Sequence, residues 1–308
     1  MKVLITGGSG FLGSHITDSL LTRGDSVVVI DNYETGRRDN LKSHPNLKVV
    51  EGTIVDANLL DSLFDGVDLV IHAAASYKNP ENWAEDAKSN ICGTINVVKS
   101  CLKHNVKRVI YFQTALCYGT KPLEQPITLN HPILPEGSSY SISKTAGEQY
   151  IHLSGLDYVT FRLANVYGPR NISGPLPVFY SRLTNNKPCF VMDTRRDFVY
   201  VDDLVAVVIK AVDGVGSGTY HVSSGSDISI KEMFDATTTA LNMGTIDVEV
   251  RPRLLDDAPS ILLDPSKTND TFDWFANTKL EEGVKNAVSY YHNFGINETF
   301  THLHSVEE

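Results

Sequence analysis

Short and nearly continuous runs of valine, isoleucine and leucine alternate with helical stretches through the first half of the chain. The runs lie at 3–5, 26–30, 47–50, 68–71, 108–112 and 158–163. A strand with one face in water would alternate apolar and polar residues, so uninterrupted runs are typical of parallel strands that helices cover on both faces. The pattern therefore predicts an α/β fold with a doubly wound parallel sheet.

The first run is followed by a helical pattern. Leu12, Ile16 and Leu20 recur every four residues, and Gly24 comes after them. This spacing predicts a helix that ends at the glycine. Similar patterns predict further helices near 90–104, 140–153 and 203–211.

The residue composition and the hydrophobic periodicity of the chain change after the sixth run. Glycine–proline pairs become frequent there, which indicates a loop-rich segment. We expect a larger domain over residues 1–165 plus about 200–226. A smaller C-terminal α/β substrate lobe is expected over residues 166–199 and about 227–308, with a cleft between the two.

The composition excludes several classes of protein. The chain has 308 residues with 27 basic and 37 acidic side chains, and its net charge is −10. Duplex nucleic acid requires a basic face, so we expect no nucleic-acid partner. No apolar run approaches the roughly 18 residues of a membrane span, and no signal-peptide layout begins the chain. We expect a cytoplasmic protein without a membrane partner.

The cysteines and one buried histidine give no sign of a metal site. Cys92, Cys101, Cys117 and Cys189 are too widely spaced for a zinc knuckle or a disulfide framework. His72, which follows an apolar run, is expected to be a buried strand-end residue rather than a metal ligand. We therefore expect no bound metal.

A glycine-rich turn joins the first strand to the first helix. Gly7, Gly10 and Gly13 have the spacing G-x-x-G-x-x-G, which can be a plain tight turn or can let a diphosphate approach the helix N-terminus. Asp31 ends the second strand about 20 residues further on, where a carboxylate would hydrogen-bond a ribose and repel a 2′-phosphate. The combination predicts NAD rather than NADP. Arg37 and Arg38 could weaken that preference or form a solvated charge cluster.

A tyrosine and a lysine lie one helical turn apart. Tyr140 and Lys144 would share a helix face, although about one such pair is expected by chance in this composition. A cation lowers the pKa of a phenol, whose ordinary value is about 10, so the phenolate could take a proton from a sugar hydroxyl. Thr114, just beyond the fifth strand, could hydrogen-bond the same hydroxyl.

Eight motifs follow one another in a fixed order along the chain. They are T-G-G-x-G-F-L-G at 6–13, Asp31-Asn32, Ile71-His72-Ala73-Ala74-Ala75, Asn90-x-x-Gly93-Thr94-x-Asn96-Val97, Thr114-x-x-x-Tyr118-Gly119, Tyr140-x-x-x-Lys144, Asn165-Val166-Tyr167-Gly168-Pro169-Arg170 and Arg196-Asp197-Phe198-Val199-Tyr200-Val201-x-Asp203. Over nearly the whole chain this order resembles the extended short-chain dehydrogenase/reductase family, in its nucleotide-sugar epimerase/dehydratase branch. Within the branch the chain resembles UDP-sugar 4-epimerases. Its segments 75–78, 83–86 and 112–118 are most similar to sugar epimerases of bacterial lipopolysaccharide O-antigen loci.

The resemblance implies a Rossmann-type fold, an NAD cofactor and a nucleoside-diphosphate sugar as substrate, with UDP as the expected nucleotide. It implies that Thr114, Tyr140 and Lys144 are the catalytic set. The cofactor-binding residues are expected to be Gly7, Gly10, Phe11, Leu12, Gly13, Asp31, Asn32, Thr53, Ile54, Ala73, Ala74, Ala75, Asn90, Tyr140 and Lys144. The expected substrate-binding residues are Thr114, Asn165 and Arg196, together with Lys78, which could serve a carboxylated sugar or lie on the solvated surface.

Two further expectations come from the resemblance. Many members carry Gly-Asp-Ile or Gly-Asp-Leu where this chain has Gly52-Thr53-Ile54. The carboxylate beside the adenine is therefore missing, although the Thr53 hydroxyl could accept the same hydrogen bond. The helices near 90–104 and 140–153 form a four-helix bundle in dimers of the family, so a homodimer is expected.

The residues after Thr114 narrow the reaction. Relatives that dehydrate sugars carry an acid pair there and those that decarboxylate glucuronate carry a glutamate, whereas this chain has Ala115 and Leu116. Neither side chain can transfer a proton. We therefore expect a 4-epimerase that oxidises C4 to a ketone and returns the hydride to the opposite face, in polysaccharide or glycoconjugate precursor synthesis.

Three alternatives stay open at this point. A 4-ketoreductase would use the same catalytic residues but consume reduced cofactor, usually NADPH, which Asp31 disfavours. An atypical dehydratase could use Cys117, although a small apolar strand residue is the simpler interpretation of that thiol. A non-catalytic NAD-sensing protein would usually have lost the tyrosine–lysine pair.

Overall fold

The computed structural model describes residues 1–253, 257–296 and 298–300. Its centre is a sheet of seven parallel strands in the order β11-β6-β5-β4-β1-β2-β3. These strands are β1 (Lys2–Thr6), β2 (Ser26–Asp31), β3 (Leu47–Glu51), β4 (Leu69–His72), β5 (Arg108–Thr114), β6 (Tyr158–Leu163) and β11 (Gly218–Val222). The order reverses between β1 and β4, as in a doubly wound Rossmann-type sheet. The α/β fold that the apolar runs predict is confirmed.

Helices cover both faces of this sheet. On one face α1 (Phe11–Arg23) and α7 (Val201–Val212) bury Ile16 and Leu204 against Val3 of β1. On the other face α2 (Ala57–Asp61), α4 (Thr94–Lys103) and α5 (Ser139–Leu153) bury Val97 and Ile151 on the side of Leu4. Successive strand side chains point to opposite faces, so the nearly continuous apolar runs of the inner strands fill two cores at once.

The ends of two helices bear on the sequence predictions. Gly24 ends α1 with φ +91°, and its N–H donates to the carbonyl oxygens of Leu20 and Leu21. The helix expected near 90–104 is two elements, a π-helix η2 (Ala87–Gly93) followed by α4. At this widened turn α5 comes very close, because a Cβ on Gly147 would lie 2.7 Å from the carbonyl oxygen of Asn90.

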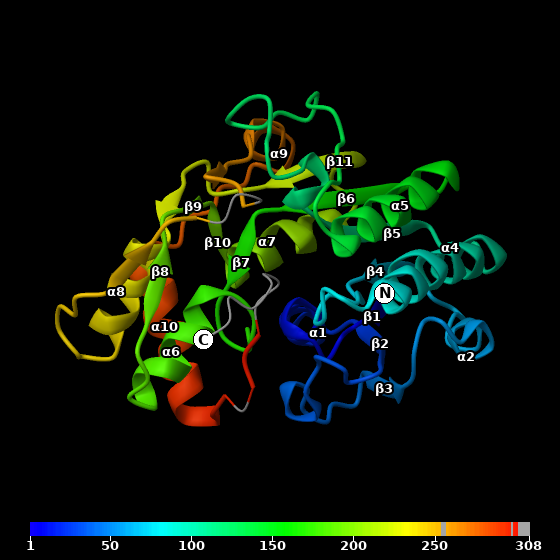
Figure 1. Ribbon diagram of the computed structural model, residues 1–308. Coiled ribbons are helices and arrows are strands. Elements are labelled where there is room, and N and C mark those ends of the chain that lie inside the picture. The colour runs from blue at the N-terminus through cyan, green and yellow to red at the C-terminus, as the bar shows by residue number, and fades with distance from the viewer. Residues whose placement is uncertain (254–256, 297, 301–308) are drawn as a thin grey trace.

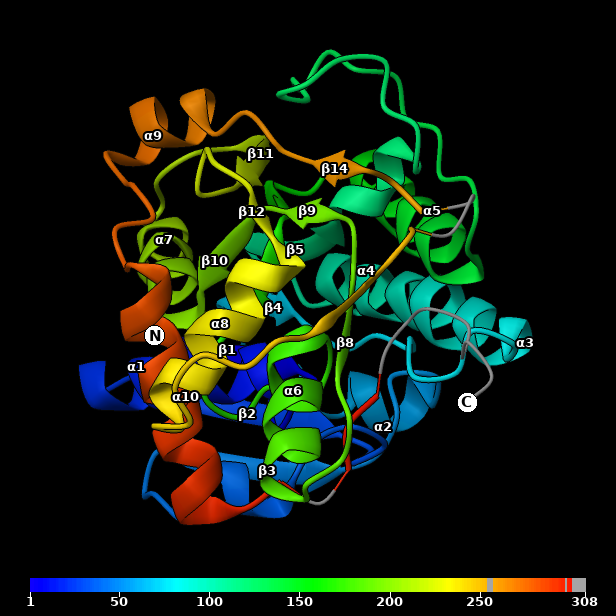
Figure 2. The ribbon, with the colours of Figure 1, turned by 60° about the vertical axis from the view of Figure 1, so that its left-hand side comes forward.

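The rest of the chain builds a smaller lobe, which Figures 1 and 2 show beside the large sheet with α6, α8 and α10 gathered together. Its core contains Phe179, Phe234 and Tyr291. The helices are α6 (Pro175–Thr184), α8 (Ile230–Ala240) and α10 (Leu280–Phe294). The strands are β7 (Asn165–Tyr167), β8 (Phe190–Met192), β9 (Arg195–Arg196), β10 (Phe198–Tyr200), β12 (Ile228–Ser229), β13 (Glu249–Arg251) and β14 (Ser260–Ile261).

Short elements connect these units. They are the 3₁₀ helices η1 (Arg38–Asn40) and η3 (Ala115–Tyr118), and the helices α3 (Trp83–Asp86) and α9 (Ser266–Phe272). Ile261, Leu263 and Phe272 pack into the core of the large sheet rather than that of the lobe. The expected division into two domains stays a prediction, and these three residues, which were expected in the lobe, pack against the large sheet instead. No helix in the described ranges is long and apolar enough to cross a bilayer.

A buried ionic network joins α5 to the sheet. The Glu148 carboxylate of α5 lies 3.0 Å from Nη2 of Arg162 in β6 and accepts a hydrogen bond of 3.2 Å from Nε2 of Gln113 in β5. Arg162 also donates to the Tyr118 hydroxyl at 2.7 Å, and that hydroxyl lies 2.6 Å from Nε2 of His221 in β11. The network therefore fixes α5 against three strands.

Removal of the Glu148 charge tests how much this network stabilises the fold. A buried ion pair that loses one partner leaves the other charge uncompensated, so Glu148→Gln should lower the free energy of unfolding by about 3 kcal/mol or more in urea titrations. The control is Asp235→Asn, which breaks the exposed pair between Asp235 and Lys231 of α8 and should change stability by less than about 0.5 kcal/mol. Equal effects of the two variants would contradict the prediction.

Candidate active site

A large cavity lies at the carboxyl edge of the parallel sheet. Its volume is about 1130 Å³. Residues from the ends of β1, β2, β3, β4, β5 and β6 line one side of it, and residues of the smaller lobe line the other. Ligands of doubly wound sheets bind at this edge, beside the point where the strand order reverses.

The glycine-rich turn forms the floor of the cavity beside β1. Gly7 has φ +68°, and a Cβ on it would lie 2.7 Å from the Ala74 nitrogen. A Cβ on Gly13 would overlap the carbonyl oxygen of Gly7. The turn can therefore be formed only without these side chains, and the backbone at the start of α1 stays open to a diphosphate.

Asp31 lies where β2 enters the cavity. Its Oδ2 accepts a hydrogen bond of 2.8 Å from the Ser9 N–H, and its Oδ1 accepts one of 2.8 Å from the Tyr33 N–H. Burial raises the pKa of this carboxyl group, and the backbone hydrogen bonds from Tyr33, Ser9 and Gly10 oppose that shift. The carboxylate is thus held in one orientation at the edge of the cavity.

The two neighbouring arginines point elsewhere. Arg37 pairs with Asp39, and Arg38 pairs with Glu51 at 2.7 Å and lies over the Tyr33 ring. Neither arginine lines the cavity. They are therefore a solvated charge cluster in this structure, which leaves the preference that Asp31 gives against a 2′-phosphate intact.

Thr114, Tyr140 and Lys144 line the same cavity. Thr114 ends β5 and accepts a hydrogen bond of 3.2 Å from the Leu116 N–H. Tyr140 and Lys144 come from the first turns of α5, where the Ser138 hydroxyl caps the helix by accepting from the Ser141 N–H. The fold thus brings to one cavity the three residues that are predicted from the sequence to be catalytic.

Burial dominates the ionisation of this group. It lowers the pKa of Lys144 to about 7, and Glu148 partly offsets the shift. It raises the pKa of Tyr140, with smaller contributions from Tyr77 and Asp86. The Lys144 Nζ lies 3.9 Å from the centre of the Tyr111 ring. In the protein alone the phenol is therefore protonated, and its expected activation depends on further positive charge in the cavity.

A directional chain of hydrogen bonds supports the wall behind Lys144. The Ala74 N–H donates to the Thr6 hydroxyl, which lies 2.7 Å from Nδ1 of His72. Nε2 of His72 lies 2.9 Å from the Thr94 hydroxyl, which donates to the Asn90 carbonyl oxygen. Burial lowers the pKa of His72 to about 3. This neutral imidazole is a structural link, and no group of three possible metal ligands occurs in the described part of the chain.

The residues after Thr114 present apolar surface to the cavity. Ala115 and Leu116 line it, whereas Cys117 does not. Cys117 is fully buried, and burial raises the pKa of its thiol to about 12. A thiol in this environment cannot serve as an acid or a base toward a ligand in the cavity.

The lobe side of the cavity holds several basic residues. Arg196 lies 2.6 Å from Oδ1 of Asp257 and donates to the Ala258 carbonyl oxygen, and burial lowers its pKa while Asp257 opposes that shift. Asn165 lines the cavity beside it. Arg182 and Arg251 also line it and were missed from the sequence, because no local motif marks them.

Most of the other expected cofactor residues line the cavity. They are Gly10, Phe11, Leu12, Asn32, Thr53, Ile54, Ala73, Ala74 and Ala75. Asn90 and Lys78 do not. The Asn90 side chain is buried and bonds to both the N–H and the carbonyl of Ser76, while Lys78 pairs with Glu298 at 3.1 Å.

The low pKa of Lys144 has a consequence for stability. Between about pH 7 and about pH 10 the unfolded chain holds the Lys144 proton and the folded protein does not. The free energy of unfolding should therefore rise with pH, by about 1.4 kcal/mol per pH unit from this group. Urea titrations of nucleotide-free protein at several pH values measure the slope. Lys144→Met should lack this contribution, and parallel pH profiles for the two proteins would contradict the assignment.

Comparison with known proteins agrees with this geometry. A model of the NAD dependent epimerase/dehydratase family matches residues 3–223. The structure is similar to that of the Bordetella bronchiseptica enzyme WbmH in complex with NAD⁺, with 54% identity, a TM-score of 0.93, and coverage of 96% of this chain and 99% of that one.

Two other relatives extend the comparison. The structure of Bordetella bronchiseptica WbmG in complex with NAD and UDP is 42% identical, covers 98% of both chains and has a TM-score of 0.90. The UDP-glucose 4-epimerase of Mycolicibacterium smegmatis is 30% identical over 314 residues, which cover 95% of this chain and 99% of the relative. With the glycine turn, Asp31 and the cavity between them, these matches show that the chain belongs to the NAD-dependent epimerase/dehydratase family and that its cofactor is NAD.

Proposed function

We propose that the protein is a nucleotide-sugar 4-epimerase. The observation that carries the proposal is the composition of the cavity wall. Thr114, Tyr140 and Lys144 line the same cavity, and the two residues that follow Thr114, Ala115 and Leu116, add only apolar side chains to it. Such a wall can remove and return a proton at one hydroxyl. It offers no second acid next to Thr114 to drive an elimination.

Each catalytic residue has a distinct role in this proposal. Tyr140 takes the proton of the C4 hydroxyl, Thr114 donates a hydrogen bond to the same oxygen, and Lys144 stabilises the phenolate. When bound, NAD supplies a hydride acceptor for the C4 hydrogen and a positive charge near the phenol. The 4-keto sugar then turns, Tyr140 returns the proton, and the hydride arrives at the opposite face, so that no electrons are gained or lost overall.

The lobe side of the cavity supports a nucleoside diphosphate as the handle of the substrate. Arg196, Arg182 and Arg251 line that side, and guanidinium groups hold phosphates by charge-assisted hydrogen bonds. The Bordetella WbmG structure contains UDP as well as NAD. We therefore propose a UDP-linked sugar as the substrate.

A deuterium label at C4 of a UDP-sugar tests the reaction and the role of Tyr140 together. The wild-type protein should interconvert the epimers without added cofactor and keep the label at C4. Tyr140→Phe should still carry NAD, identified by mass spectrometry after denaturation, but should slow the reaction by about 100-fold or more, as for loss of a general base.

The matched control for this assay is Tyr290→Phe. Tyr290 lies on α10, stacks on Phe294 and does not line the cavity, so this variant should keep the wild-type rate. Loss of the label in the wild-type protein, or more than a few per cent of the wild-type rate in Tyr140→Phe, would overturn the mechanism. A protein that carries no NAD and consumes NADPH with a 4-keto substrate would instead be a ketoreductase.

The exposed face of α5 supports a homodimer as part of this proposal. Ile142, Tyr150 and Leu153 are apolar or aromatic and exposed on α5, as is Leu102 on the neighbouring α4. Val97, Val98 and Cys101, by contrast, face the sheet. These exposed side chains lie on the two helices for which the family resemblance implies a helical bundle.

Light scattering after size-exclusion chromatography tests the dimer. The wild-type protein should have twice the 33.9 kDa mass of the chain, and Leu153→Asp should give the monomer because a carboxylate would be buried in the bundle. Leu123→Asp is the control, since Leu123 is 76% exposed against 79% for Leu153 but lies outside both helices. A wild-type monomer, or a Leu153→Asp dimer, would refute the assignment.

A further inference from the structure

A second hollow opens beside the cofactor cavity, beyond the end of β3. Its volume is about 410 Å³. It is lined by Asn32, Glu51, Gly52, Thr53, Val55, Glu85 and Lys88. Asn32, Gly52 and Thr53 also line the large cavity, so the two spaces are adjacent.

The position of Asp31 fixes which part of NAD reaches this hollow. A carboxylate at the end of the second strand holds the adenosine ribose in dinucleotide-binding sheets. The next residue, Asn32, and the residues after β3 follow the two strands beyond β1, whereas Tyr140 and Lys144 lie on α5, which packs on β5 and β6 at the other side of the sheet. The adenine ring, which is attached to that ribose, therefore extends past Thr53 into the hollow.

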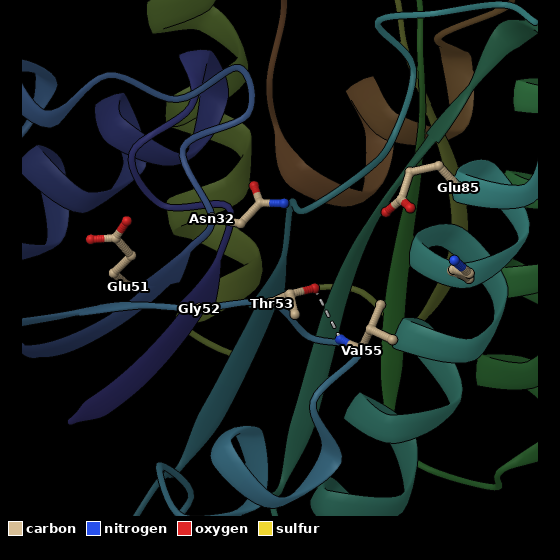
Figure 3. A pocket seen from close by; sticks show the side chains of 7 residues that line it. Asn32, Glu51, Gly52, Thr53, Val55 and Glu85 are labelled. Atoms are coloured by element: carbon tan, nitrogen blue, oxygen red, sulfur yellow. Dashed lines mark hydrogen bonds between the residues drawn. The ribbon is translucent and has the colours of Figure 1, made fainter. Parts of the chain in front are cut away.

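Adenine carries an exocyclic amino group, which requires an acceptor. Two neutral oxygens at the hollow already accept one backbone hydrogen bond each, which leaves each of them a single lone pair, and the charged acceptors that line the hollow are its two carboxylates. The Thr53 hydroxyl accepts a hydrogen bond of 3.2 Å from the Val55 N–H, drawn as a dashed line in Figure 3, and the Asn32 Oδ1 accepts one of 3.2 Å from the Glu34 N–H. Lys88 has only donors to offer.

The two carboxylates of the hollow differ in their surroundings. Glu51 pairs with Arg38 at 2.7 Å, and in Figure 3 its carboxylate points away from Thr53 and Asn32. Glu85 points from α3 across the hollow toward Asn32. Its Oε1 accepts a hydrogen bond of 3.0 Å from the Ser89 hydroxyl, and no ion pair to it occurs among the described residues.

We propose that Glu85 accepts a hydrogen bond from the 6-amino group of the NAD adenine and that the Ser89 hydroxyl holds the carboxylate in place. Ser89 itself lines the large cavity and is buried. A carboxylate has about four lone-pair sites, so the bond from Ser89 leaves Glu85 able to accept from the amino group. The adenine is thus recognised by a carboxylate from the helix α3, in a chain that has Thr53 after β3. The proposal depends on NAD binding and is independent of the 4-epimerase reaction.

Deamino-NAD, in which a carbonyl oxygen replaces the 6-amino group, tests this assignment. Purified protein is exchanged to completion with an equimolar excess of NAD and deamino-NAD, washed and denatured, and the released nucleotides are quantified by mass spectrometry. The wild-type protein should retain NAD over deamino-NAD by about tenfold, as expected for a hydrogen bond to a charged acceptor.

Variants separate Glu85 from the rest of the hollow. Glu85→Gln should bring the ratio to within about threefold of unity, because an amide can accept from the amino group and can also donate to the carbonyl oxygen. Glu51→Gln is the matched control and should keep the wild-type ratio. Ser89→Ala should lower the ratio without reversing it.

Two results would overturn the proposal. One is a wild-type protein that retains both dinucleotides equally, and the other is a Glu85→Gln variant that keeps the full preference for NAD. Thermal unfolding of each variant shows whether it is folded. Because the assay needs no sugar substrate, a failure of the 4-epimerase proposal would leave its outcome unchanged.

Discussion

Burial of the large sheet on both faces is the constraint on which the rest of this structure depends. Because α1 and α7 cover one face and α2, α4 and α5 the other, a polar side chain in the middle of the inner strands β1, β2, β4, β5 and β6 has no access to water. Functional groups can reach a ligand only where the strands end. Thr114, Asp31 and the alanines after β4 all stand at that edge, and the cavity lies there for the same reason.

The same burial sets the electrostatics of the site. Lys144 lies deep enough for its pKa to fall to about 7, and only Glu148, one helical turn further, opposes the shift. Glu148 is itself compensated by Arg162. The negative charge of Glu148, close to the catalytic pair, is therefore compensated by a residue of β6. The same ion pair fixes α5, the helix that carries Tyr140, to the sheet.

Much of this arrangement could be predicted from the sequence, because it depends on local patterns. Apolar runs predict the strands. The position of Gly7 and Gly13 between a strand and a helix predicts a diphosphate-binding turn. The contact of Arg196 with Asp257, the approach of Arg251 to the cavity and the place of Glu85 could not be predicted. These residues meet others that are distant in the chain, or depend on the direction of a single side chain. Cys117 illustrates a middle case: it is buried, as expected of an apolar residue, but it lies in the 3₁₀ helix η3 rather than in a strand, and its separation from the cavity could be seen only in the fold.

The pair of Arg196 with Asp257 gives the lobe side of the cavity a particular property. The guanidinium already has a carboxylate 2.6 Å away, so an anion that approaches it competes with an occupant fixed in the protein. The free energy of binding is then the difference between two ion pairs instead of the gain of one. An anion avoids this competition where it bonds to the donors that the Arg196 guanidinium does not already give to Asp257 and to the carbonyl oxygens of Arg195 and Ala258. The pair therefore fixes the direction from which an anion could reach this guanidinium, because only the unused donors face a newcomer.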